Sequence, residues 1–72
     1  MDISKGLYKA LETMYHSEIE DAKVRLAIYF EKSVAIGEHP QHTEEMDKLL
    51  SQISSAEDNL ESLKKYFNEY NN

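Results

Sequence analysis

The chain has 72 residues and a formal net charge of −6 at pH 7, from 14 acidic residues against 8 basic ones. A chain of this length forms one small unit with little buried surface, and the lack of cysteine excludes a disulfide scaffold, a thiolate zinc site and a cysteine nucleophile. The acidity argues against a surface for nucleic acids or anionic membranes, because both need clustered Lys and Arg.

A cytoplasmic location is expected. The longest apolar run, Leu26–Phe30, is too short to span a bilayer. No signal peptide is visible at the N-terminus, because no basic segment is followed by an apolar one.

The first predicted helix runs from about residue 3 to residue 33, with Asp2 or Ser4 as its N-cap. Its apolar residues recur at spacings of 3, 4, 4, 3, 4 and 4. These predicted seam residues are Tyr8, Leu11, Tyr15, Ile19, Ala22, Leu26 and Phe30. The spacing is closer to an eleven-residue repeat than to a strict heptad, so this helix is expected to be nearly straight.

A turn is predicted at about residues 34–39. Gly37 tolerates the positive φ that a chain reversal needs, and Pro40 suits the first turn of a new helix, where its missing N–H is no loss.

The second predicted helix runs from about residue 40 to residue 70 and carries an unbroken heptad, with spacings of 3, 4, 3, 4, 3, 4 and 3. Its seam residues are Met46, Leu49, Ile53, Ala56, Leu60, Leu63, Phe67 and Tyr70. Such spacing keeps one stripe of a helix facing a partner helix, as in a coiled coil.

The two seams together predict an all-α fold, residues 1–72 forming a single antiparallel two-helix hairpin with no strand. The short turn makes the helices antiparallel neighbours. A register in which facing residue numbers sum to 75 pairs Ile19 with Ala56 and Ala22 with Ile53. Each alanine then faces an isoleucine, and large side chains opposite small ones interdigitate well.

Apolar residues outside the seams indicate a second partner for the hairpin. The candidate oligomer contacts are Leu7, Met14, Val24, Ile28, Leu50 and Tyr66. A helix with more than one apolar stripe expects more than one neighbour. The simplest closure is a homodimer in which two hairpins form a four-helix bundle.

The histidines do not form a known metal pattern. His39 and His42 are flanked by Glu38 and Glu45, and His16 follows Glu12 by four residues. Di-iron bundles use Glu-x-x-His, and neither Glu12 nor Glu38 precedes a histidine by three. We therefore predict no metal and no cofactor. A metal-binding helical bundle is kept as the second alternative function.

No residue pattern indicates catalysis. Nothing in the sequence buries a pair of carboxylates or holds a base beside Ser51, Ser54 or Ser55. Gly37 is isolated, so there is no phosphate-binding loop. We predict that the protein is not an enzyme and has no catalytic residues.

Four segments resemble small uncharacterised helical-hairpin proteins of large tailed bacteriophages. They are residues 15–19 (YHSEI), 34–40 (VAIGEHP), 45–49 (EMDKL) and 56–60 (AEDNL). The resemblance covers most of the chain, and the Ile-Gly-Glu-His-Pro stretch is its most specific part. It implies a phage or phage-rich origin and expression in the bacterial host cytoplasm, and it brings no activity.

The favoured function is therefore a small acidic helical protein that acts through protein contacts, as an oligomeric scaffold or accessory protein. Its expected partner is a second copy of itself. A basic host or phage protein is the other candidate partner. The alternative is an acidic DNA mimic or inhibitor that occupies a basic site on a host protein. A mimic needs one-sided rows of acids, whereas here Lys9, Lys23, Arg25, Lys48 and Lys64 are interspersed among the acids.

Overall fold

The computed structural model describes residues 2–36 and 41–72. Helix α1 spans Ile3–Ile36, helix α2 spans Gln41–Phe67, and a short 3₁₀ helix, η1, spans Asn68–Asn71. No strand occurs in these two ranges, so the expected all-α fold with two helices is confirmed. The turn residues Gly37 and Pro40 lie outside the described residues.

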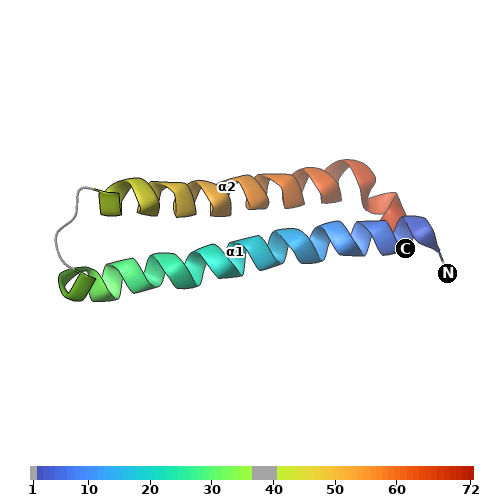
Figure 1. The fold of residues 1–72 in the computed structure, drawn as a ribbon. Coiled ribbons are helices and arrows are strands. Elements are labelled where there is room, and N and C mark those ends of the chain that lie inside the picture. The colour runs from blue at the N-terminus through green and yellow to red at the C-terminus, as the bar shows by residue number, and fades with distance from the viewer. Residues whose placement is uncertain (1, 37–40) are drawn as a thin grey trace.

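The two helices lie side by side and antiparallel, with both chain ends at the same end of the molecule (Figure 1). This arrangement is consistent with the expected helical hairpin. The molecule measures 50 × 20 × 14 Å, so it is a single layer of helices. Neither described helix is long and apolar enough to cross a membrane.

Both helix ends follow from local sequence. Asp2 caps α1, because its Oδ1 accepts a hydrogen bond of 3.3 Å from the Lys5 amide and its backbone oxygen accepts one of 3.0 Å from the Gly6 amide. Helix α2 ends at Phe67 and tightens into η1, three residues before the end that we predicted. The cause is the asparagine-rich end of the chain, because asparagine is a weak helix former and final turns often become 3₁₀.

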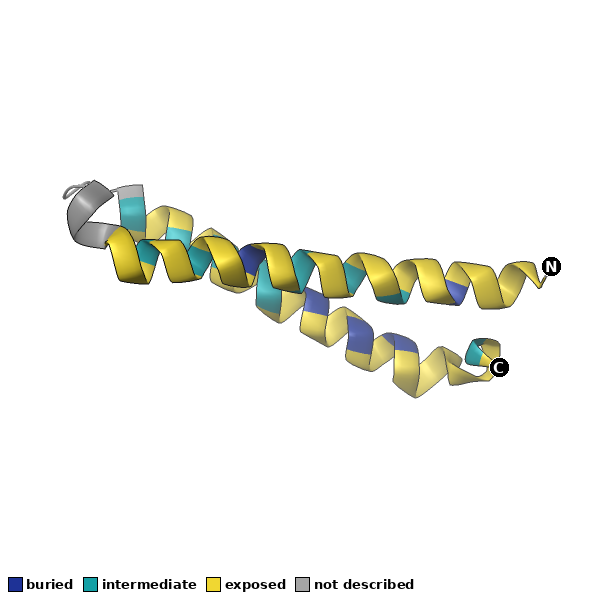
Figure 2. Ribbon diagram, turned by 90° about the horizontal axis from the view of Figure 1, so that it is seen from below, coloured by how far each residue is buried: buried dark blue, intermediate teal, exposed yellow. Residues whose placement is uncertain are grey.

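Few residues are buried. The core consists of Tyr8, Ala22, Ala56, Leu60 and Leu63 (Figure 2). Half-buried residues extend it into a line along each helix. In α1 the line is Tyr8, Glu12, Tyr15, Ile19, Ala22, Leu26 and Tyr29. In α2 it is His42, Met46, Leu49, Ile53, Ala56, Leu60 and Leu63. Both lines step by 4, 3, 4, 3, 4 and 3 residues, so both packed faces follow a heptad.

The predicted seam of the first helix is wrong at two positions. Phe30 is 69% exposed and Leu11 is 38% exposed, while Tyr29 and Glu12 are half-buried at those levels. The predicted spacing took two successive steps of four, which rotate a position away from a facing helix. Alternating steps of three and four keep the line facing α2, so the packed face does not follow the eleven-residue repeat.

Two side-chain contacts join the helices along the seam. The rings of Tyr29 and His42 meet edge to face with centroids 5.6 Å apart. Gln52 Nε2 donates a hydrogen bond of 2.8 Å to the backbone oxygen of Glu18. The residue numbers of these pairs sum to 71 and 70.

Pairs across the groove at the chain ends give higher sums. Leu11 and Leu63 line that groove together with Tyr8 and Phe67, and these pairs sum to 74 and 75. Side-chain contacts therefore scatter over about one helical turn, and the register with a sum of 75 stays a prediction.

Both seam alanines are buried, Ala22 at 0% and Ala56 at 1% exposed. The predicted register places each of them opposite an isoleucine, and large side chains opposite small ones interdigitate well. A heptad repeats after every two turns and nearly repeats after one, so the seam pattern alone cannot distinguish registers one turn apart.

Candidate interaction surface

A second line of residues, which we call the outer stripe, runs along α1 outside the packed seam. It consists of Ile3, Leu7, Ala10, Met14, Ser17, Asp21, Val24 and Ile28. Its steps of 4, 3, 4, 3, 4, 3 and 4 residues make it a heptad line of its own. Leu7, Met14 and Ile28 each directly precede a seam residue, so they lie about 100° around the helix from the seam.

The apolar members of the outer stripe are exposed. Ile3 is 70% exposed, Leu7 62%, Val24 60%, Ile28 49% and Met14 46%. Each lies at a position that a heptad would bury against a partner helix, yet α2 covers none of them. Contiguous exposed apolar surface of this kind marks interaction sites in soluble proteins.

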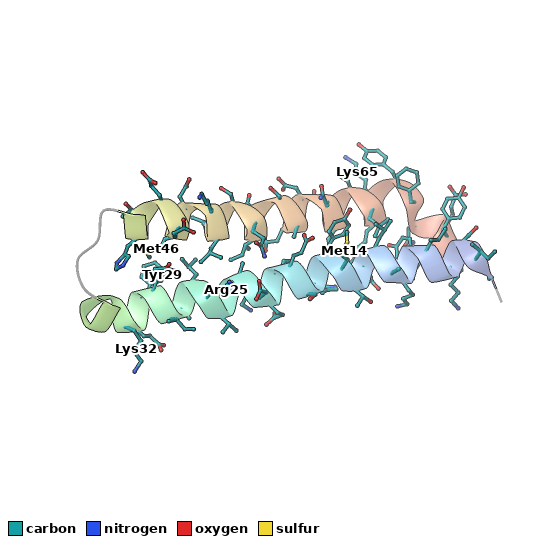
Figure 3. The ribbon with its side chains drawn as sticks, viewed as in Figure 1. Met14, Arg25, Tyr29, Lys32, Met46 and Lys65 are labelled. Carbon is teal, nitrogen blue, oxygen red and sulfur yellow. The ribbon has the colours of Figure 1, made fainter. Side chains whose placement is uncertain are left out.

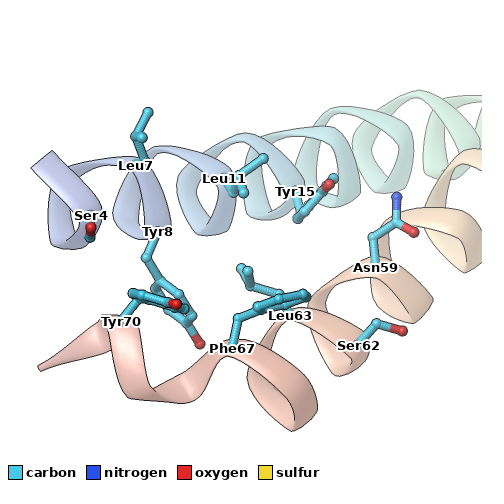
Figure 4. A pocket seen from close by; sticks show the side chains of 10 residues that line it. All are labelled: Ser4, Leu7, Tyr8, Leu11, Tyr15, Asn59, Ser62, Leu63, Phe67 and Tyr70. Carbon is cyan, nitrogen blue, oxygen red and sulfur yellow. The ribbon is translucent and has the colours of Figure 1, made fainter.

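A groove of about 540 Å³ lies beside the outer stripe, near the chain ends (Figure 4). Leu7 and Leu11 line it from α1, and Leu63 and Phe67 line it from α2. Tyr8 points across to the opposite chain segment, whereas Leu7 points away from it (Figure 4). The groove therefore joins the outer stripe to α2 on one face of the molecule.

On that face, α2 presents a line of residues without charge, which we call the uncharged row. It consists of Gln52, Ser55, Asn59, Ser62 and Tyr66, at steps of 3, 4, 3 and 4. Asn59 and Ser62 line the groove opposite Leu7 and Leu11, so the row and the stripe share a face. We call the outer stripe, the groove and the uncharged row together the apolar face.

The charged residues of α2 over the same length lie off this row. They are Glu57, Asp58, Glu61, Lys64 and Lys65. The same line continues toward the start of α2 through Lys48 and Glu45, so it lacks charge only from Gln52 to Tyr66. A surface poor in charge loses little hydration when a partner covers it.

Tyr8 holds a hydroxyl with no partner. The residue is 3% exposed, and its hydroxyl oxygen is buried without a hydrogen bond among the described residues. An unsatisfied buried polar group costs about 1–3 kcal/mol. The aromatic ring compensates by filling the space between α1 and the end of α2.

Ion pairs occur between neighbouring turns of each helix. The N–O distances are 3.2 Å for Lys9–Glu12, 3.4 Å for Lys23–Glu20, 3.0 Å for Arg25–Asp21 and 3.3 Å for Lys48–Glu45. Such exposed pairs contribute about 0–1 kcal/mol each. Their effect on the surface is to place cations among the acids. Asp21, the acid of the outer stripe, is one of the paired residues.

The candidate metal and catalytic residues do not gather. Among the described residues, no three His, Cys, Asp or Glu side chains are close enough to hold a metal ion. His42 packs on Tyr29, which is about 20 Å along α1 from the exposed His16. His39 and Glu38 lie outside the described residues. Ser51, Ser54 and Ser55 are exposed.

The predicted seam residues divide into three groups. Tyr8, Ala22, Ala56, Leu60 and Leu63 are buried. The half-buried ones are Tyr15, Ile19, Leu26, Met46, Leu49 and Ile53. Leu11, Phe30, Phe67 and Tyr70 are exposed, although Phe67 and Tyr70 line the groove together with Leu11.

The six candidate oligomer contacts are all exposed, but they do not share one face. Leu7, Met14, Val24 and Ile28 lie on the outer stripe, and Tyr66 lies on the uncharged row. Figure 3 shows Met14 and Figure 4 shows Leu7 on α1. Leu50 follows the seam residue Leu49 by one position and lies on the other flank of α2. The sequence reasoning missed the uncharged row, whose signal is an absence of charge at heptad spacing.

Comparisons with protein-family models, with curated proteins and with solved structures found no match. The phage resemblance therefore stays a prediction.

Proposed function

We propose that this is a non-enzymatic protein that acts through protein–protein contacts, as a small oligomeric scaffold or accessory protein. One observation carries the proposal. The outer stripe repeats the heptad of the packed seam, yet its large apolar residues are 46–70% exposed. A line of knobs at heptad spacing is suited to pack against another helix.

The shape of the molecule supports self-association. A single layer 14 Å thick cannot shield both sides of its helices from water, and only five of the described residues are buried. Small domains of this kind commonly gain stability by oligomerising. Two such layers stacked face to face give a four-helix bundle, which is the assembly we propose.

The charge layout supports a scaffold over an acidic mimic of DNA. Lys9, Lys23, Arg25 and Lys48 each lie within 3.4 Å of a carboxylate on their own helix. A phosphate mimic needs rows of acids left open to a basic partner. Here the cations break the rows, and the most continuous surface feature is apolar.

Light scattering on the purified chain tests the proposal. We expect at least twice 8.4 kDa, with dissociation only on dilution. The variant Leu7→Gln/Val24→Gln should weaken association at least tenfold, because it removes two stripe residues. The matched control Phe30→Gln/Leu50→Gln removes two equally exposed apolar residues outside the apolar face and should leave association unchanged. A species of 8.4 kDa at all concentrations contradicts the proposal.

A further inference from the structure

The outer stripe matches itself when one copy is turned end for end. If facing residue numbers sum to 31, Leu7 meets Val24, Ile3 meets Ile28, and Met14 meets Ser17. Both apolar ends of the stripe then find apolar partners. The two polar positions, Ser17 and Asp21, fall against Met14 and Ala10 near the centre.

We propose that the partner of the apolar face is a second copy of this chain, with the two α1 helices antiparallel across a twofold axis between Tyr15 and His16. This inference rests on the proposed function and specifies its geometry. A twofold interface uses the same patch on both copies, so the patch must complement itself, as the stripe does.

The register follows from what the neighbouring registers would do. A shift of one helical turn, to a sum of 35, places Ile3 against Lys32 and Met14 against Asp21. Both contacts bury apolar side chains against charge, which is unfavourable. At a sum of 31, Asp21 faces the small Ala10, and its carboxylate keeps Arg25 as an ion-pair partner at 3.0 Å.

Charge restricts the face through which a second copy can bind. Two chains of −6 each repel, so a twofold contact is favoured only through a face that holds few charges. On α2, the uncharged row is such a surface, because positions 52, 55, 59, 62 and 66 carry no charge. The acids Glu57, Asp58 and Glu61 lie off the row and stay in water.

The area of the face is sufficient for a stable dimer. The broad face of the molecule measures about 50 by 20 Å, on the order of 1000 Å². Stable protein interfaces bury about 800 Å² on each partner. Full contact between the broad faces of two copies therefore reaches the size that a specific dimer needs.

Cysteine crosslinking tests the pairing, because the chain has no cysteine of its own. Leu7 and Val24 of one chain are about 26 Å apart along α1, far beyond the roughly 7 Å between Cα atoms that a disulfide allows. In the proposed dimer, Leu7 of one copy lies against Val24 of the partner subunit. The same geometry keeps the two copies of Leu7 about 26 Å apart.

We expect a mixture of the Leu7→Cys and Val24→Cys chains to form disulfide dimers on mild oxidation, while neither chain alone does so. Ile3→Cys mixed with Ile28→Cys should behave in the same way. Lys9→Cys mixed with Lys23→Cys is the matched control, at the same levels of α1 but off the stripe, and should not crosslink. Helical circular dichroism of each variant checks the fold; all substituted side chains are exposed.

Three outcomes overturn the inference. Crosslinking of either single variant with itself means parallel α1 helices. More efficient crosslinking of Leu7→Cys with Ile28→Cys than with Val24→Cys means the shifted register. A dimer by light scattering that forms none of these crosslinks means another interface, and in all three cases the proposed function stands. A monomer by light scattering overturns both.

Discussion

Gln52 donates a hydrogen bond of 2.8 Å from its Nε2 to the backbone oxygen of Glu18, across the two helices. A helical carbonyl has two lone pairs, and the intrahelical bond uses only one. The side chain of Gln52 is half-buried, so this bond forms at the edge of the packed seam. It ties α2 to α1 at one level.

Removing this bond should destabilise the fold. We expect Gln52→Ala to lower the free energy of unfolding by about 0.5–1.5 kcal/mol, the usual net value of one hydrogen bond. Ser51→Ala, at the exposed neighbouring position, is the control and should lower it by no more than a few tenths. Urea denaturation measures both. Equal behaviour of the two variants would show that the bond does not hold the helices together.

The predicted register can be tested by exchanging side-chain volume at one level. Ala22 is fully buried and faces Ile53 in that register, so Ala22→Leu should overpack its layer and cost about 1–3 kcal/mol. Adding Ile53→Ala returns the volume and should recover part of that loss. Adding Leu49→Ala, one turn away, should recover less. Denaturation curves of the single and double variants decide between the two; stronger recovery with Leu49→Ala would reject the predicted register.

The hydroxyl of Tyr8 should contribute nothing to stability. It is buried without a partner, so Tyr8→Phe removes an unsatisfied polar group and keeps the ring. We expect the free energy of unfolding to stay the same or rise by about 1 kcal/mol. Thermal melting and urea denaturation of Tyr8→Phe, with the half-buried Tyr15→Phe as the comparison, measure the effect. A loss above about 1 kcal/mol would mean that the hydroxyl has a partner in solution.

The sequence specifies the seam of α2 well and that of α1 poorly, for a physical reason. In α2, polar residues flank every seam position except Leu49, which Leu50 follows, so one heptad line fits best. In α1, Leu11 precedes the seam residue Glu12 and Phe30 follows Tyr29, so the apolar pattern favours the wrong neighbour at both levels. Glu12 can occupy a seam position because its carboxylate, in a side chain 19% exposed, pairs with Lys9 at 3.2 Å.

The register and the apolar face depend on information that side-chain hydrophobicity does not hold. The side chain of Gln52 bonds to a backbone oxygen, and every residue has one. The residue type at position 18 therefore cannot predict this bond. The apolar contacts Leu7, Met14, Val24 and Ile28 could be found as surplus hydrophobic positions. That they share a face with the uncharged row follows only from the folded structure, in which residues of both helices line one groove.

Salt should strengthen the proposed dimer. Each chain carries −6, so association brings two acidic molecules together, while the one acid of the outer stripe, Asp21, is paired with Arg25 and the uncharged row carries no charge. Raising the salt concentration from 0.01 M to 0.5 M shortens the Debye length from about 30 Å to well under 10 Å and screens this repulsion. The dissociation constant should therefore fall as salt rises, as analytical ultracentrifugation can measure. An interface held by ion pairs between the chains would respond in the opposite sense, because salt weakens exposed ion pairs. A dissociation constant that rises with salt would thus reject an interface made from the outer stripe and the uncharged row.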